Sequence, residues 1–548
     1  MPSNADAAEL FRGNADVLDV LGERFKPEAY RRAARSIESL TEDLAAVAER
    51  DALRSIPGVG DAIEEKIREY LRTGRVDYYE RLQTEVPPGI LTLLRTPGLG
   101  PKTARRFWLE LGVAGPTELA DAIREGRLTG VKGFGPKKIE QIRLALAAAA
   151  QAPPAARLPI EAAYPIAVHL MDGLRAAGGI QEIEIAGSFR RARETVGDLD
   201  LLVTSAEPER IFDAFTRLPE VREVRLRGGT KETVLLTNGL QVDLRVVEPA
   251  AFGAALQYFT GSKDHNVRLR SLARDRGLKI NEYGVFRGEE RVGGRTEEEV
   301  YAALELAWIP PELREDRGEV DAARIGPLPP LVGRSDLVGD LHFHLPPDAG
   351  AEEVDALLAA ADGRRFAYLG CVVGGTSDDG SAFALSPAAL DRLDAPPPRR
   401  VRVGRVVEVG PDGSLPERRE LRPDYVIVRP TSGAADPPRS LAKGLRATAI
   451  AHVGGEAGGR RWVAWAKSHD LAVEVGPGPN RLDSTGARTA REAGVRLLVP
   501  TGLGRPDDDP TCAVALGFAR RAGAGPADVR NTASAAEVTR GWRAGQRG

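Results

Sequence analysis

The first part of the chain carries its apolar residues at the three- and four-residue spacing of helices. Leu40, Leu44, Val47 and Ala48 follow this spacing, and glycine or proline stands where the spacing is interrupted. The pattern extends from about residue 8 to 150. We therefore expect this region to be helical throughout.

From about residue 160 to 316, short β-rich runs alternate with amphipathic stretches, which predicts an α+β region. The predicted strands are 183–185, 199–203, 233–236 and 242–247, and the predicted helices include 207–217 and 264–276. A polar stretch near 314–335 follows. The remainder alternates short apolar strands with alanine-rich helices, which predicts an α/β domain.

Length and composition indicate a soluble, multidomain protein. A chain of 548 residues predicts about three to five domains. The net charge is only −3, but Arg95–Arg143 holds ten Lys or Arg against five Asp or Glu, a local basic face suited to nucleic acid. Cys371 and Cys512 are the only cysteines, which excludes a disulfide framework and a Cys-ligated zinc site. No leader and no apolar run of about 20 residues is present, so we expect a cytoplasmic protein, and a monomer because no heptad repeat occurs.

A glycine-x-glycine pattern occurs three times in the helical region, within Ile56–Gly60, Thr96–Lys102 and Val131–Lys138. Glycine permits a tight turn, and the free N–H groups that start the next helix can bind a phosphate oxygen. The pattern resembles the helix-hairpin-helix motif, which grips a DNA backbone without reading its bases. The residues expected to contact DNA are Gly58, Gly60, Gly98, Gly100, Lys102, Gly133, Gly135 and Lys137.

Lys66 lies in the predicted helix after the first of these turns. One interpretation is a solvated helical lysine, which its neighbours Asp61, Glu64 and Glu65 favour. The other is a Schiff-base nucleophile, which would need a lowered pKa.

The most specific segment of the chain is 185–203. Gly187 and Ser188 follow a strand and expose donors suited to phosphate. Asp198 and Asp200 alternate with leucines, so on a strand both carboxylates point to one face. Their mutual repulsion is relieved by a cation, and oxygen ligands select Mg²⁺ or Mn²⁺. If Asp243 on a later strand lies beside them, three carboxylates could hold two ions for an in-line displacement.

Two sets of motifs carry a resemblance to a known family. Gly187–Arg191 with Gly197–Asp200 resembles the signature of beta-type nucleotidyltransferases, and 257–270 with 277–284 resembles the nucleotide-binding subdomain of family X DNA polymerases. The resemblance covers roughly residues 8–316. It implies a template-directed DNA polymerase that fills gaps in repair, with gapped DNA and dNTP as partners.

The resemblance also implies residue roles. Asp198, Asp200 and Asp243 would be metal ligands, Asp243 would accept the primer proton, and Lys66 would match a 5′-deoxyribose-phosphate lyase lysine. Gly187, Ser188, Arg191 and Gly197 would contact the triphosphate. Tyr258, Phe259 and Gly261 would lie against the sugar. Asn266 would face the incoming base, and Arg270 would face the template strand. Gln241 is a departure, because vertebrate members carry an arginine there, so a cation at that point is in doubt.

Six segments are expected on this basis. They are a lyase-like helical domain with the first hairpin at 1–88, a second hairpin subdomain at 89–156, a nucleotidyltransferase palm at 157–250, a nucleotide-binding or thumb subdomain at 251–316, a linker at 317–335, and a domain at 336–548 that resembles a polymerase-and-histidinol-phosphatase (PHP) domain.

The likeness to a PHP domain begins at His342 and His344, whose spacing on a strand puts both imidazoles on one face. The other ligand positions of that family match poorly, and they fall on or near Ala349, Val373, Val406, Pro430, Gly502 and Gly504. Only His342, His344 and His452 remain, with no well-placed bridging carboxylate, although Glu408 is close to the expected position of the glutamate. We therefore expect a domain that keeps its fold, holds partial metal or none, and lacks 3′-exonuclease activity.

Two other functions stay open from the sequence. One is a template-independent or tRNA-type nucleotidyltransferase, which would share the paired aspartates. The other is a DNA-binding scaffold without activity, for which the hairpins would suffice.

Overall fold

A computed structural model gives the fold of the chain. It describes residues 4–38, 40, 44–73, 75–94, 99–129, 131, 134–135, 138–143, 146, 157–376, 382–395, 401–409, 423–428, 447–450, 456–478, 481–504 and 509–540. The chain forms two compact units, Met1–Ala156 and Arg157–Gly548.

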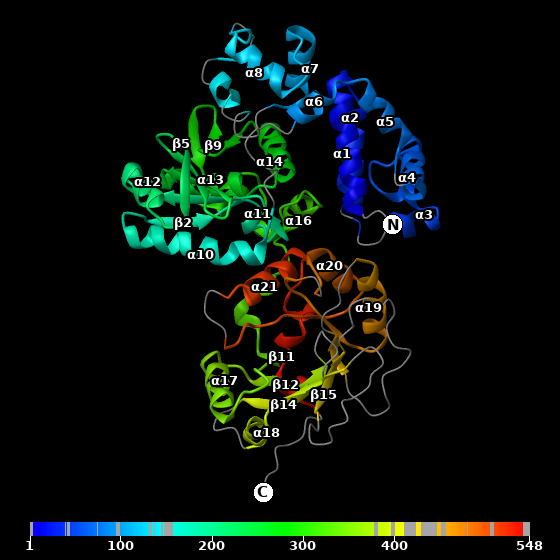
Figure 1. Cartoon of the computed structure of the whole chain (residues 1–548), viewed down its shortest axis with the longest axis vertical. Coiled ribbons are helices and arrows are strands. Elements are labelled where there is room, and N and C mark those ends of the chain that lie inside the picture. The colour runs from blue at the N-terminus through cyan, green and yellow to red at the C-terminus, as the bar shows by residue number, and fades with distance from the viewer. Residues whose placement is uncertain are drawn as a thin grey trace. The chain divides into compact units, whose positions relative to one another are not determined.

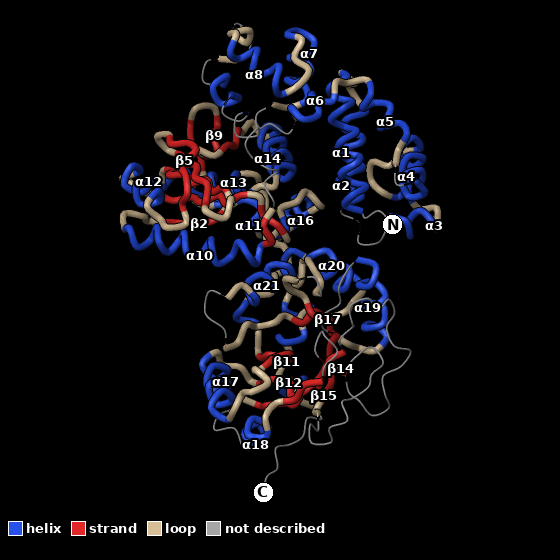
Figure 2. Tube along the Cα trace, viewed as in Figure 1, coloured by secondary structure: helices blue, strands red, loops and turns tan. Residues whose placement is uncertain are grey.

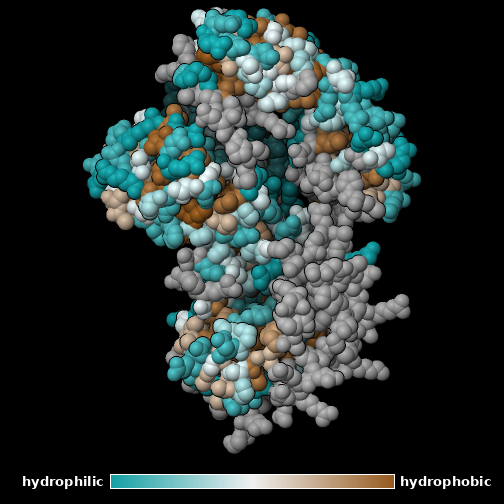
Figure 3. All heavy atoms as spheres, in the orientation of Figure 1, coloured by the Kyte–Doolittle hydropathy of each residue, from teal (hydrophilic) through white to brown (hydrophobic). Residues whose placement is uncertain are grey.

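The first unit contains helices and no strand in the part that the structure describes, as the apolar spacing predicts (Figure 2). Its α-helices are α1 (Asn4–Leu21), α2 (Lys26–Glu38), α3 (Leu44–Glu49), α4 (Asp61–Thr73), α5 (Asp77–Thr84), α6 (Pro88–Leu93), α7 (Pro101–Leu111) and α8 (Pro116–Arg124). Phe11, Leu18 and Ile37 are fully buried where α1 packs along α2. Hydrophilic side chains cover much of the visible outer surface of these helices (Figure 3).

The second unit opens with a five-stranded sheet of order β2-β4-β7-β6-β5. The strands are β2 (Glu182–Ile185), β4 (Asp198–Thr204), β5 (Val221–Arg227), β6 (Lys231–Leu236) and β7 (Gln241–Val247). Two helices, α10 (Ile160–Ala177) and α12 (Pro208–Thr216), share one apolar core with the sheet. β4 and β7 run parallel at the centre, with β2 antiparallel to β4. The four predicted strands of this region are confirmed.

A smaller subdomain follows this sheet. Its elements are α13 (Phe252–Thr260), α14 (Lys263–Asp275), a three-stranded sheet of β8 (Lys279–Asn281), β9 (Gly284–Arg287) and β10 (Glu290–Gly293), α15 (Glu297–Ala302) and α16 (Glu319–Ile325). Leu269, Val300 and Tyr301 lie in its buried core.

The C-terminal domain is built on an eight-stranded sheet. Its parallel strands, in sheet order, are β11 (Gly339–His344), β12 (Tyr368–Thr376), β14 (Arg402–Val409), β15 (Tyr425–Val428), β16 (Ala447–Ile450), β17 (Ala472–Glu474) and β18 (Leu497–Leu498), and β13 (Ala382–Ala384) pairs antiparallel with β12. The helices are α17 (Ala351–Gly363), α18 (Pro387–Asp394), α19 (Glu456–Ser468), α20 (Ser484–Glu492), α21 (Thr511–Arg521) and α22 (Ala535–Val538). Helices alternating with parallel strands confirm the α/β expectation.

The two parts of the second unit share apolar contacts. Ile160 belongs to the buried core of the C-terminal domain, and Tyr164 and Phe189 pack against that core. Phe189 also packs against the core of the five-stranded sheet. The phosphate-binding segment predicted around Ser188 is therefore anchored on both sides.

Candidate active site

The three aspartates singled out by the sequence come together on the two central strands. Asp198 and Asp200 alternate on β4 with Leu199 and Leu201, which are fully buried. β7 pairs parallel with β4 in a register that sets Asp243 directly opposite Asp200. Burial of the leucines fixes which face of β4 the carboxylates occupy, so the apolar alternation itself places the acidic pair.

The electrostatics of this group favour a cation. Burial, together with the charges of Asp198 and Asp243, raises the pKa of Asp200 to about 7. Burial and Asp243 also raise the pKa of Asp198. Carboxylates that resist ionisation because they are buried and close to one another would be stabilised in their charged form by a divalent ion. The residues therefore fit the hard-metal site that the sequence predicts.

Asp243 is also held by protein partners. Thr233 Oγ1 donates a hydrogen bond of 2.7 Å to Asp243 Oδ1, and Lys231 Nζ lies 2.5 Å from Asp243 Oδ2. Both partners come from β6, the strand next to β7. Gln241 Nε2 is 3.4 Å from Asp243 Oδ1. A cation does stand beside the third aspartate, and its source is Lys231 rather than position 241.

The segment after β2 approaches the aspartates closely. It begins with the short helix α11 (Gly187–Arg190), where Gly187 has a φ of +66°. The positive φ favours glycine at this position, and a Cβ there would lie 2.6 Å from Asp200 Oδ2, so a larger residue would displace the Asp200 carboxylate. Ser188 follows directly, and Gly197 immediately precedes the acidic strand.

Two arginines of this segment join it to the following subdomain. Arg190 makes a two-pronged ion pair with Glu297, at 2.7 and 3.0 Å, and Arg314 pairs with the same carboxylate from the other side at 2.6 Å. Arg191 Nε donates to Glu315 at 3.0 Å, and its Nη1 donates to the carbonyl of Thr260. The sequence did not predict the carboxylate partners, because they lie more than 100 residues away along the chain.

The residues expected at the sugar and base lie on α13 and α14. Tyr258 and Phe259 form an edge-to-face pair with ring centroids 5.1 Å apart, and the guanidinium of Arg245 lies 4.1 Å from the Phe259 centroid. Gly261 ends α13 with a φ of +71°. Asn266 Nδ2 donates to the carbonyl of Tyr258 at 2.7 Å, which ties α14 to α13.

Arg270, expected at the template strand, is exposed on α14. Arg270 is the last residue in sequence, within the second unit, that is predicted to contact DNA or nucleotide. An exposed guanidinium on a helix suits a contact to phosphate or base edge.

In the first unit, two of the three glycine turns lead into well-defined helices. Gly60 precedes α4 and Gly100 caps α7, and no side chain caps α7 at Gly100. Among the residues that the structure describes, nothing lies within 4 Å of a Cβ built at Gly60, Gly100 or Gly135. These helix starts are open, so their first N–H groups can meet a phosphate. Gly58 has a φ of +89° and makes the turn, and Lys102 follows in the first turn of α7.

Three of the predicted DNA contacts lie outside the described residues. They are Gly98, Gly133 and Lys137.

Lys66 on α4 is half-buried rather than solvated. Its Nζ donates to the carbonyl of Ala62 at 2.9 Å and lies 4.6 Å from the ring centroid of Tyr78. Burial lowers the pKa of Lys66, and the carboxylates of Glu65 and Glu69 oppose that shift. A lysine with a lowered pKa against an aromatic ring is a better nucleophile than an exposed one.

A second titratable cluster lies in the C-terminal domain. His342 and His344 on β11 and Glu408 on β14 can each turn one ligand atom to a common point. His342 Nε2 lies 2.9 Å from Glu408 Oε1, His344 Nε2 lies 3.4 Å from the same oxygen, and Glu474 Oε2 on β17 is 3.4 Å from His342 Nδ1. His342 and His344 line a cavity of about 560 Å³.

The expectation that no carboxylate is well placed beside these histidines is wrong. Glu408 and Glu474 are both about 1% exposed and both adjoin His342. The ends of parallel strands meet at one edge of a sheet, so strands far apart in sequence deliver their side chains to one place. His452 lies outside the described residues.

Comparisons with known proteins cover most of the chain. The sequence model of a helix-hairpin-helix domain matches residues 2–76, that of a SAM-like helix-hairpin-helix tandem matches 90–148, and that of the DNA polymerase beta thumb matches 255–315. Among the described residues, no helix combines the length and apolar character needed to cross a bilayer.

Three curated proteins are similar to the chain. The protein named DNA polymerase/3′-5′ exonuclease PolX from Bacillus subtilis (strain 168) is 32% identical over 530 residues, which is 90% of this chain and 91% of that protein. Proteins named DNA polymerase lambda from Arabidopsis thaliana and Rattus norvegicus are each 26% identical over 347 residues. Those matches cover 57% of this chain and 62% and 56% of the two relatives.

Proposed function

This chain belongs to the family X DNA polymerases, and we propose that it adds deoxynucleotides to the primer 3′-hydroxyl in short gaps of damaged DNA. The observation that carries the proposal is the register of β4 and β7, which sets Asp243 opposite Asp200 with Asp198 two residues away. Three carboxylates on adjacent positions of two paired strands, beside an arginine-rich segment, suit phosphoryl transfer better than a passive DNA-binding face.

The aspartates would hold two divalent ions, Mg²⁺ or Mn²⁺. When bound, such ions lower the pKa of the attacking hydroxyl and neutralise charge on the triphosphate. Asp198 and Asp200 present oxygens from β4, and Asp243 presents its carboxylate from β7 and accepts the primer proton. Lys231 and Thr233 hold Asp243 in place for that role.

The incoming nucleotide would be bound by the residues around the acidic strands. Ser188, Arg191 and the backbone of Gly187 and Gly197 would meet the triphosphate. The face of Tyr258 and Phe259, with the turn at Gly261, would pack against the sugar, where a close backbone excludes a ribose 2′-hydroxyl. Asn266 and Arg270 would face the base and the template.

DNA would be gripped without sequence preference by the glycine turns of the first unit. The open helix starts at Gly60 and Gly100 offer N–H donors to backbone phosphates. Lys66 would remove a 5′-deoxyribose phosphate through a Schiff base, which its burial against Tyr78 supports.

A direct test is incorporation of one deoxynucleotide into a one-nucleotide gap with Mg²⁺ or Mn²⁺. Asp243→Ala is expected to lower the rate about a hundredfold or more. Asp213→Ala is the matched control, because Asp213 is an aspartate of the same sheet domain that pairs with Arg227 at the surface. Tight binding of gapped DNA without incorporation would favour a scaffold, and equal incorporation on single strands would favour a template-independent transferase.

For residues 336–548 we infer a PHP-like domain that has lost 3′-exonuclease activity and holds at most a partial metal site. His342, His344 and Glu408 could bind one ion, whereas glycine stands at 502 and 504, where that family carries its last aspartate and histidine. A multi-metal hydrolase needs more ligands than these.

Digestion of 3′ ends with Mn²⁺ tests this loss. The full chain carrying Asp243→Ala is expected to leave a single-stranded 3′ end intact. Digestion that survives Asp243→Ala and disappears in Glu408→Gln would overturn the inference and assign a nuclease to the cluster.

A further inference from the structure

The C-terminal domain touches the segment that would bind the triphosphate. Helix α21 lies at the edge of the domain that faces α10 and α11 (Figure 1). A Cβ at Gly517 of α21 would lie 2.8 Å from the Cβ of Ala192, so glycine lets the helix backbone reach this segment. The segment 187–194 therefore adjoins the acidic strand β4 at Gly187 and α21 at Ala192.

Arg521, near the end of α21, bonds to this segment directly. Its Nη1 donates to the carbonyl of Arg191 at 3.1 Å and to Glu315 Oε1 at 2.8 Å. Its side chain is only 2% exposed. Glu315 Oε1 also accepts from Arg191 Nε at 3.0 Å. One guanidinium thus fixes both the backbone of Arg191 and the carboxylate that orients the Arg191 side chain.

Cations outnumber anions in this contact. Burial alone would raise the pKa of Glu315, but Arg521, Arg191 and Arg193 lower it to about 2. Burial lowers the pKa of Arg191, and the charges of Arg521 and Arg193 lower it further. Glu194 also interacts with Arg521 and Arg193, so three guanidinium groups face two carboxylates. The remaining positive charge is what a polyphosphate would balance.

A second tether holds the other end of the segment. Ser484 Oγ, at the start of α20, donates to Glu194 Oε1. Glu194 stands between the arginines and Asp198, so both ends of the turn are fastened to the same domain.

We propose that Arg521 is a positioning residue for the polymerase reaction, and that the C-terminal domain serves to hold the triphosphate-binding segment in place. This rests on the proposed function of the site. The role is independent of any nuclease, because α20 and α21 lie outside the cluster of His342, His344 and Glu408. In this role the domain contributes to the polymerase whether or not it keeps nuclease activity.

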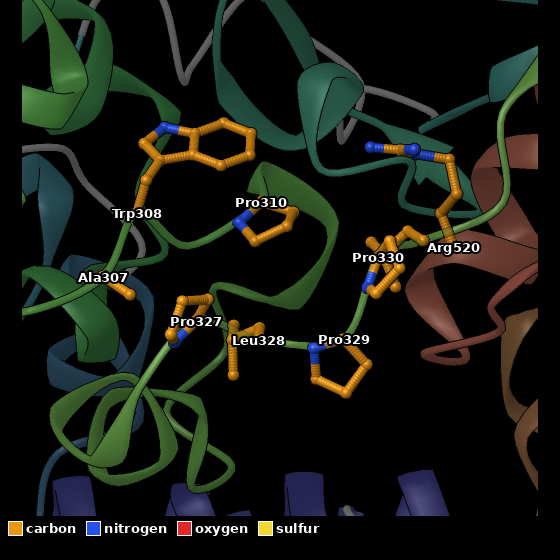
Figure 4. Close-up of a pocket in the computed structure, with 9 residues that line it drawn as sticks. Ala307, Trp308, Pro310, Pro327, Leu328, Pro329, Pro330 and Arg520 are labelled. Atoms are coloured by element: carbon orange, nitrogen blue, oxygen red, sulfur yellow. The ribbon is translucent and has the colours of Figure 1, made fainter.

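The neighbouring residue provides a matched control. Arg520 leaves α21 in another direction and pairs with Glu312 at 2.6 Å and with the carbonyl of Val332 at 3.1 Å. It lines a pocket of about 420 Å³ together with Trp308 and a run of prolines (Figure 4). Arg520 and Arg521 therefore both join α21 to the preceding subdomain, but only Arg521 contacts the triphosphate segment.

The test compares Arg521→Ala, Arg521→Lys and Arg520→Ala in the full chain. On a one-nucleotide gap, Arg521→Ala is expected to raise KM for dNTP about tenfold, the effect of one lost charge-assisted hydrogen bond, with a smaller fall in kcat. Arg521→Lys restores part of the loss because it keeps the charge, and Arg520→Ala stays within about twofold of the wild type. Affinity for gapped DNA is unchanged in all three.

Direct binding separates this inference from the proposed function. Titration of dNTP with Mg²⁺ onto the protein and a dideoxy-terminated gap should show about tenfold weaker binding for Arg521→Ala even if the wild type does not turn over. Equal dNTP affinity in Arg521→Ala and wild type, or equal losses in Arg521→Ala and Arg520→Ala, overturns the inference. If Arg521→Ala does not fold, Ser484→Ala carries the same test, with a smaller rise in KM.

Discussion

Lys231 Nζ lies 2.5 Å from Asp243 Oδ2, and this ion pair joins β6 to β7 at the centre of the acidic site. The position beside the third aspartate, where a cation would be sought from the sequence, holds Gln241. The counter-charge comes from the neighbouring strand instead. Lys231 also favours ionisation of Asp198 and Asp200, whose pKa values it lowers against the effect of burial.

Replacing Lys231 should therefore impair the polymerase while leaving the fold intact. Lys231→Ala is expected to lower kcat on a gapped duplex about tenfold, because Asp243 loses its ion-pair partner and Asp198 and Asp200 lose one of the cations near them. Lys231→Arg keeps the charge and should retain most of the activity. Lys279→Ala, at an exposed lysine of β8, is the control for general loss of charge. Full activity of Lys231→Ala would show that the ion pair between Lys231 and Asp243 has no role in the polymerase reaction.

The pH dependence of metal binding follows from Asp200. Its pKa of about 7 means that protons compete with a divalent ion below that pH. The apparent affinity for Mg²⁺ is expected to rise about tenfold between pH 6 and pH 8 and then to level off. Isothermal titration on the full chain measures it, and Asp200→Asn should flatten the dependence.

Asp200 also affects the stability of the folded protein, and this contribution falls as the pH rises, whereas the affinity for Mg²⁺ increases. The folded state keeps a proton on Asp200 at a pH where the unfolded chain has released it, so this contribution to stability is present at pH 4 and lost as pH rises through 7. Mg²⁺ should accordingly raise the melting temperature at pH 8 more than at pH 6. An equal rise at both values would contradict the assignment.

Lys66 should be the lysine that forms a Schiff base with an abasic sugar. Borohydride trapping on 5′-incised abasic DNA is expected to fall at least about tenfold in Lys66→Ala, since no other group replaces the amine. Lys138→Ala is a close match for comparison, because Lys138 lies 4.3 Å from the centroid of Phe134, as Lys66 lies 4.6 Å from that of Tyr78. Undiminished trapping in Lys66→Ala would assign the chemistry elsewhere.

Two glycines of the first turn should separate stability from DNA binding. Gly58→Ala is expected to destabilise the first unit by about 1 kcal/mol or more, because φ is +89° and a Cβ would lie 2.8 Å from Arg32 Cγ. Gly60→Ala meets nothing within 4 Å and should leave stability unchanged.

DNA affinity should be lowered by Gly60→Ala, the variant that leaves stability unchanged. A methyl group at Gly60 stands where a phosphate would approach α4, so binding of gapped DNA by Gly60→Ala is expected to weaken about threefold to tenfold. Fluorescence anisotropy measures this, and unchanged binding would remove Gly60 from the DNA contact.

Sequence patterns were most informative where periodicity and chemistry coincided. β4 could be predicted because buried leucines alternate with Asp198 and Asp200. β5 was missed because it is an exposed edge strand whose side chains are mainly charged, and its short alternation at Val224 and Leu226 is not marked by burial. The assignment of strands around the active site therefore depended on burial on one face.

Partners distant in the chain could not be predicted. Glu297 and Glu315 hold the arginines of the triphosphate segment, and Glu408 and Glu474 stand beside His342. Each is an ordinary carboxylate in its local context, and only the tertiary fold brings it to its partner. The family spacing falls on Val406, so the sequence points close to Glu408 but does not show that this carboxylate reaches His342 and His344.

Phe189, which packs on two apolar cores at once, sets a limit on how this protein can be dissected. A polymerase fragment ending before residue 317 would expose the side of Phe189, Ile160 and Tyr164 that the C-terminal domain covers. Such a fragment would expose an apolar surface, prone to aggregation, next to the segment proposed to bind the triphosphate. Engineers seeking a minimal enzyme would do better to redesign that face with polar residues than simply to shorten the gene.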